Sequence, residues 1–376
     1  MILNIKPIRT PALRMKEDIY ATFLNYIGRD YMLLLSSSWG FRVNLNNVKT
    51  VDEYINLEEN TLEYCLNNYF GINAELLTHS AFADYLNDIY NSMADNIPVV
   101  LNVFSIGLPY HRTYMNPETA HEHPVLLIGY DVENVYILDP PWTFDVVQLK
   151  KKELEKILLS IEKFDVGNAA TDVEINTVLK TMLDKVQRRD DIGDMFDSIY
   201  YFAEIIEKKF DISIDSEGKE YDMETLRFHP LISGLDYIGR LRLCMVDVLK
   251  YMANKYEIDS LNLISDLFQQ NAQAWIRMRY MLIKGCCRSR DSFLVAKKNV
   301  AEKIRNLATQ ERKIRDQIQN ILDNTLLSTN YIKKEDNTSF EIVEIDLREY
   351  FNNCAFHNSQ NELKANFNIK EIEYYI

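Results

Sequence analysis

The chain has 376 residues, of which 47% are hydrophobic, so it is long enough to form two domains and to bury a substantial core. Its formal net charge is −14, with 42 basic and 56 acidic residues, and the basic residues are spread along the sequence. This distribution provides no surface that would follow a phosphate backbone and argues against nucleic acid as a partner.

The apolar segments and the cysteines of the sequence indicate in which compartment the protein is expected. The N-terminal residues contain no continuous apolar segment typical of a signal peptide, and the longest apolar runs are too short to span a bilayer. We therefore expect a cytoplasmic protein with no membrane partner. The odd number and the spacing of the cysteines predict reduced thiols that mainly fill the core. They are Cys65, Cys244, Cys286, Cys287 and Cys354.

The first 165 residues mix helical and strand patterns. Thr10 and Pro11 are typical of an N-cap and a first helical position, and apolar residues at helical spacing continue as far as Gly28, which predicts a first helix. Further helices are predicted at about 57–70 and 80–94. Three β-branched runs separated by turn residues then predict a buried antiparallel sheet, at residues 99–104, 125–130 and 135–138.

Beyond residue 170 the pattern is almost wholly helical. Long amphipathic helices are predicted at about 176–209, 230–255, 259–284 and 288–324. The apolar face of the last helix either packs against the same chain or forms the seam of a dimer. Residues 339–345 alternate between polar and apolar side chains and predict a final strand at a sheet edge.

One pair of predicted strands carries candidate catalytic residues. His123 lies near the start of one strand, and Asp139 ends the next. A carboxylate so placed can orient an imidazole, as in the base of a cysteine enzyme. Each residue also has a purely structural interpretation. His123 could be a histidine bonded to a backbone carbonyl, and Asp139 could simply end a strand in a turn.

Four segments resemble the N-terminal domain of the butirosin biosynthesis protein H family: NYIGRDY at 25–31, SWGF at 38–41, HPVLLIGYD at 123–131 and LDP at 138–140. The helical half is similar to the domain that often follows it. The resemblance implies an α+β protein with a papain-like fold over residues 1–165, related to the double-glycine peptidases that process bacteriocins, and a helical domain over 166–376. It further implies acyl transfer from a carrier-bound thioester to an amine in natural-product (antibiotic) biosynthesis, with His123 as general acid or base and Asp139 as its orienter.

The chain departs from this family at the nucleophile. The family's cysteine lies at the N-terminal end of the first helix, where the helix dipole and the imidazole favour the thiolate. Residues 13–20 contain neither cysteine nor serine, and Cys65, the nearest thiol in sequence, is expected to pack elsewhere. Asp18 in this region is a candidate ion-pair partner of His123 or a general base, whereas Glu17 is expected on a solvated face.

Two functions therefore stay open. The first is an altered or degenerate acyltransferase that makes or breaks an amide. The second is a non-catalytic pseudoenzyme whose cleft binds a metabolite, a carrier protein or an active paralogue. The expected partners are a small-molecule or carrier-bound acyl substrate and either a second copy of the chain or a paralogue.

Three further residues are candidates for binding the substrate: Trp39, His121 and Trp142. Both tryptophans have the alternative role of anchoring the core. His121 and His123 point to the same face of a strand and could bind zinc together with His111 or Asp139. Because no cysteine or further histidine has supporting spacing, the sequence predicts no metal and no cofactor.

Overall fold

The computed structural model describes residues 1–12, 15–46, 48–57, 61–111, 121–167, 173–212 and 226–327. Residues Met1–Ile332 form one compact unit, and the second unit, Lys333–Ile376, lies outside the described residues together with the strand predicted at 339–345. The fold is α+β, as predicted, with an antiparallel sheet followed by a mostly helical region. The boundary at residue 165 stays a prediction.

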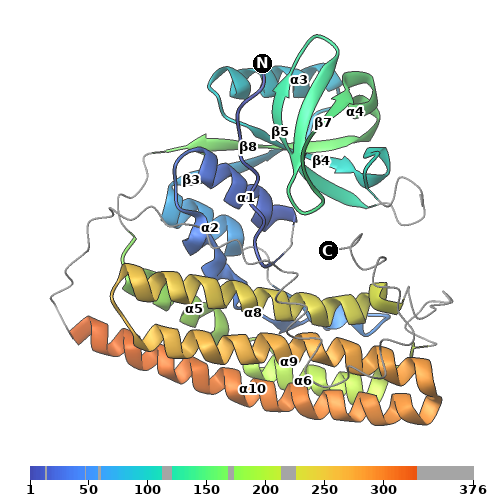
Figure 1. The fold of residues 1–376 in the computed structure, drawn as a ribbon, viewed down its shortest axis with the longest axis vertical. Coiled ribbons are helices and arrows are strands. Elements are labelled where there is room, and N and C mark those ends of the chain that lie inside the picture. The colour runs from blue at the N-terminus through green and yellow to red at the C-terminus, as the bar shows by residue number, and fades with distance from the viewer. Residues whose placement is uncertain are drawn as a thin grey trace, which may run out of the picture. The chain divides into compact units, whose positions relative to one another are not determined.

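The main sheet has six antiparallel strands in the order β3-β8-β4-β5-β6-β7 (Figure 1). Their bounds are β3 Ile72–Leu77, β4 Val99–Phe104, β5 Glu122–Tyr130, β6 Asn134–Asp139, β7 Thr143–Lys150 and β8 Leu158–Val166. The strands predicted at 99–104, 125–130 and 135–138 are confirmed as β4, β5 and β6. A two-stranded sheet pairs β1 (Arg42–Val43) with β2 (Ile55–Asn56).

Four α-helices and short 3₁₀ segments accompany these strands: α1 Met15–Tyr26, η1 Tyr31–Ser38, η2 Asp52–Tyr54, α2 Thr61–Phe70, α3 Phe82–Ala94, η3 Ser105–Gly107 and α4 Lys151–Ile157. Helix α1 packs on the main sheet, where the ring of Phe23 stacks on that of Phe164 in β8 with centroids 3.9 Å apart. The helix stops at Gly28, whose φ of 73° is easily adopted only by glycine.

The start of α1 differs from the prediction. Residues 11 and 12 form a turn, and the helix begins at Met15. The Thr10 hydroxyl, which was expected to cap the helix, instead donates to the Asp18 carboxylate over 2.6 Å. This bond connects the N-terminal segment to the first turn of α1.

The region after the sheet consists of α5 Ile175–Gln187, α6 Met195–Lys209, η6 Leu226–Phe228, α8 Pro230–Lys255, α9 Ser260–Arg288 and α10 Arg290–Leu327. Helices α8, α9 and α10 run side by side (Figure 1). The single helix predicted at 176–209 is two helices. They are separated by a turn that contains Gly193, at a φ of 132°, and Asp194 caps α6 by accepting from the backbone N–H groups of Phe196 and Asp197.

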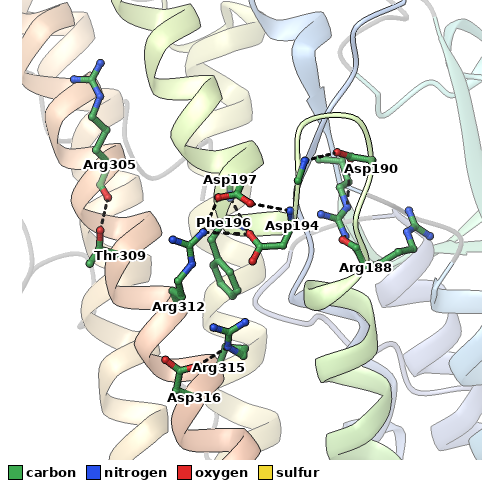
Figure 2. A network of polar contacts seen from close by, with 12 residues as sticks. Arg188, Asp190, Asp194, Phe196, Asp197, Arg305, Thr309, Arg312, Arg315 and Asp316 are labelled. Carbon is green, nitrogen blue, oxygen red and sulfur yellow. Dashed lines mark hydrogen bonds and ion pairs between the residues drawn. The ribbon is translucent and has the colours of Figure 1, made fainter.

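Helix α10 is fastened to α6 at that cap. Arg312 reaches Asp197 over 2.8 Å and Asp194 over 3.3 Å (Figure 2). The apolar face of α10 is buried within the chain, at Val300, Ile304, Leu307, Ile314 and Ile318. Packing within one chain therefore accounts for this face, and the dimer stays a prediction. No helix in the described ranges is both long and apolar enough to cross a membrane.

A buried carboxylate joins Trp39, the residue that follows η1, to the helical region. Glu311 of α10 accepts two hydrogen bonds from Arg242 of α8, over 3.0 and 2.9 Å. The side chains of Glu311, Arg242 and Trp39 are all fully buried. The Trp39 indole donates to the same carboxylate over 3.0 Å, and the Trp275 indole lies 3.4 Å from it. Trp39, expected at a pocket wall, is thus a core anchor whose polar N–H is paired inside the protein.

Candidate functional site

The pairing of β5 with β6 positions the two predicted catalytic residues. Leu126 pairs with Leu138, so Asp139 stands one residue further on, diagonal to His123 on the same face of the sheet. The Nε2 atom of His123 lies 2.7 Å from Oδ2 of Asp139, and both side chains are fully buried. The structure therefore brings together an imidazole and the carboxylate that orients it.

Tyr110 is a third member of this network that the sequence did not reveal. Its hydroxyl donates to Oδ2 of Asp139 over 2.8 Å. Burial, together with the charge of Asp139, raises the pKa of Tyr110 far above its ordinary value, so the phenol stays protonated and keeps donating. Two donors thus hold the carboxylate in one orientation. The only sequence signal was the position of Tyr110 shortly after the strand that neighbours β5.

Two further histidines gather at His123. Two hydrogen bonds join the backbone of His121 to Ser105. The His121 N–H donates to Oγ of Ser105, and the Ser105 N–H donates to the His121 carbonyl, each over 3.0 Å. This connection attaches the segment after β4 to the start of β5. The centroid of the His111 ring lies 4.9 Å from that of His123 and 5.4 Å from that of His121.

The turn between β6 and β7 brings Trp142 to the same place. The N–H of Trp142 donates to the carbonyl of Asp139 over 2.9 Å, and the Trp142 ring meets His111 with centroids 4.3 Å apart. Arg9 of the N-terminal segment donates to the carbonyls of Pro140 and Pro141, over 3.0 and 3.2 Å. Arg9 therefore fixes the turn that presents Trp142, which is 41% exposed.

Asp18 has a different neighbourhood from the one expected. Its Oδ1 accepts from the backbone N–H of Thr10 over 2.7 Å as well as from the Thr10 hydroxyl, and the side chain is fully buried. Burial raises the pKa of Asp18 to about 8, against the opposing effect of these hydrogen bonds. This shift favours the protonated acid at neutral pH. Within the described part of the chain its hydrogen bonds go to Thr10 and not to His123.

The four cysteines in the described ranges all have a thiol pKa raised by burial. Cys65 lies beside Ser36, at 3.9 Å, and burial raises its pKa to about 11. Burial also holds the pKa of Cys244 well above its ordinary value, and raises those of Cys286 and Cys287. Each shift disfavours the thiolate. Cys354 lies outside the described residues.

Comparison with known proteins places this site in a recognisable segment. Residues 36–163 match the Peptidase_C39 like family, and this stretch includes the whole of β4, β5 and β6. A crystal structure described as a C39-like peptidase from Bacillus anthracis is 21% identical, with 44% of this chain and 92% of that chain covered and a TM-score of 0.28. No curated protein matches the chain. The family match assigns a C39-like, papain-like fold to the sheet-bearing part.

Replacing Tyr110 with phenylalanine is expected to lower the free energy of unfolding by about 1.5–3 kcal/mol, because it removes a buried hydrogen bond to a charged group. Urea unfolding followed by circular dichroism measures the change. Tyr136→Phe is the matched control, since Tyr136 donates to Asp131 over 2.7 Å at the exposed surface. An equal loss in both variants would contradict the structural importance of the Tyr110 bond.

Proposed function

We propose that this chain is a degenerate relative of the papain-like acyltransferases of natural-product biosynthesis, and that its site binds an acyl-type ligand without thiol chemistry. The observation that carries the proposal is the state of His123. Its Nε2 is held by Asp139, while its Nδ1 is buried and has no hydrogen-bond partner among the described residues. The base and its orienter are retained, and no described thiol stands at the nitrogen that would activate a nucleophile.

The surroundings of the pair favour a ligand with an apolar part. Trp142 lies in the turn before β7, and Phe144 is the second residue of β7. Their exposed fractions are 41% and 53%. Exposed aromatic side chains beside a buried polar group are typical of a binding site that fixes a ligand's orientation at one end and its apolar body at the other. The fatty or aromatic acyl group of a thioester has this character.

A second candidate function is acyl transfer without a covalent enzyme intermediate, and the intact His123–Asp139 geometry favours it. In this reaction the acceptor amine attacks the thioester carbonyl directly. Its proton passes to Nδ1 of His123, the new C–N bond forms, the C–S bond breaks, and the leaving thiolate takes up the proton. Such a mechanism needs a base and an orienter but no cysteine.

Binding and turnover are tested with S-octanoyl-N-acetylcysteamine, alone and with an added primary amine. Trp142 is the only one of the three tryptophans with an exposed ring, because Trp39 and Trp275 are fully buried. A saturable change in tryptophan emission that disappears in Trp142→Phe is therefore the expected sign of binding. Intact-protein mass spectrometry is expected to show no acyl adduct, and product analysis no amide.

The other outcomes have distinct meanings. Amide formation that is lost in His123→Ala would establish the second candidate function in place of the first. An acyl adduct on the protein would contradict both, and peptide mapping would locate the nucleophile. Absence of both binding and turnover, with other acyl thioesters included in the series, would overturn the assignment of an acyl-type ligand.

A further inference from the structure

We propose that His111, His121 and His123 form a binding site for a divalent transition metal ion, with zinc the best match. One ligand nitrogen of each imidazole lies within 4.8 Å of the other two. The sequence predicted no metal because the histidines lacked supporting spacing, but the fold brings His111, seven residues after the end of β4, to the two histidines at the start of β5. This inference goes beyond the proposed function and is an alternative to its second candidate, because the single lone pair on Nδ1 of His123 cannot both bind a metal and accept a proton.

The orientation of the rings suits three ligands around one centre. The ring planes are inclined to one another by 58°, 69° and 71°, so the imidazoles converge at an angle and do not stack. Tetrahedral zinc with bonds of about 2.0–2.1 Å to imidazole nitrogen needs these nitrogens about 3.4 Å apart. To reach that geometry, the widest separation of 4.8 Å has to close by about 1.4 Å.

The second shell of such a site is already assembled. A histidine that binds a metal through one nitrogen usually donates its other N–H to a carboxylate, which fixes the tautomer and orients the ring. His123 has this arrangement, with Nε2 bonded to Asp139 over 2.7 Å and Asp139 held in turn by Tyr110. The remaining Nδ1 of His123 is fully buried and has no hydrogen-bond partner in the described part of the chain. It is the nitrogen assigned to the metal.

The site has an approach from solvent and an open coordination position. His121 is partly exposed, and the half-exposed Trp142 borders His111. The group of possible ligands among the described residues consists of the three histidines. Three protein ligands leave a fourth position for water, which is the composition of catalytic rather than structural zinc sites.

Metal binding is tested on the full chain after treatment with EDTA. Zinc is titrated in competition with a chromophoric chelator, and cobalt(II) is added separately so that its visible absorption reports the coordination geometry. We expect one zinc ion per chain and a tetrahedral cobalt spectrum. His111→Ala and His121→Ala are each expected to lower zinc affinity at least 100-fold, and Asp139→Asn about 10–100-fold through the second shell.

His79→Ala is the matched control, because His79 is also paired with a carboxylate, Asp88 at 2.7 Å, but lies in the connection between β3 and α3 and not in the cluster. It is expected to bind zinc like the parent protein. Thermal unfolding of the metal-free variants establishes that each is folded, and the partly exposed His121 is the position that best tolerates replacement. Absence of stoichiometric zinc binding, or equal affinity in the cluster variants and the control, would overturn the proposal. Because no acyl compound is present, this result is independent of the ligand-binding experiment.

Discussion

Replacing Glu311 with alanine is expected to lower the free energy of unfolding by about 3–5 kcal/mol, the cost of leaving a buried charge without its partner. The Arg242 guanidinium donates two hydrogen bonds to Glu311 and is itself fully buried. Without the carboxylate it cannot regain water, and the indole N–H of Trp39 also loses its acceptor. Urea unfolding monitored by circular dichroism and by tryptophan emission measures the loss.

Two further variants make this prediction specific. Glu311→Gln keeps the side-chain volume and one acceptor oxygen, and is expected to be less destabilising than Glu311→Ala. Glu204→Ala removes a surface carboxylate that pairs with Lys208, and should leave the urea midpoint unchanged. If Glu311→Ala behaved like the surface variant, the buried network would contribute little to holding η1 against the helices.

Replacing Asp18 with asparagine is expected to stabilise the protein at alkaline pH. The carboxyl has a pKa of about 8 in the folded state and an ordinary value near 4 when unfolded, so the folded state binds the extra proton between these values. The contribution of the Asp18 carboxyl to the free energy of unfolding is fully present below about pH 4 and is lost as the pH rises towards 8. At about 1.4 kcal/mol per unit, the loss is at most of order 5 kcal/mol.

Asparagine mimics the neutral acid at every pH, since its side-chain oxygen can accept the same two bonds from Thr10. The difference in unfolding free energy between Asp18→Asn and the parent should therefore grow from pH 4 to pH 8 and then level off. Asp247→Asn is a useful comparison, because burial raises the pKa of Asp247 only to about 6 and its effect should level off earlier. A pH-independent difference for Asp18→Asn would show that Asp18 is ionised in the folded protein.

The fold was predictable where the spacing of apolar residues along a segment was regular and the segment was clearly buried. Strands β4, β5 and β6 are central, and their nearly continuous burial appears in the sequence as β-branched apolar runs. Strands β3, β7 and β8 were missed: the edge strands β3 and β7 are mostly exposed, and the apolar run of the interior strand β8 is interrupted by the buried polar residues Ser160 and Glu162. The long C-terminal helices kept a regular apolar face and were found, apart from the turn at Gly193.

The site was only partly predictable because most of its contacts are long-range. His123 and Asp139 stand in a local strand motif, which made their pairing a reasonable hypothesis. Tyr110 and His111 belong to a turn without a periodic pattern, and their positions depend on contacts with other parts of the sheet, such as the bond from Tyr110 to Asp139. Arg9 reaches a turn 131 residues further along the chain, a relation that no local pattern encodes.

The bond between Trp39 and Glu311 also sets an order of events during synthesis. These two residues are 272 positions apart, so a ribosome adding about 5–20 residues per second needs about 14–54 s to supply the acceptor after the indole has been made. Helices α5 and α8, which pack on η1, are translated within that interval, so η1 is covered before the acceptor of the Trp39 indole exists. The nascent chain thus carries the Trp39 indole N–H and the Arg242 guanidinium without their shared acceptor until α10, the last of the described helices, has been translated.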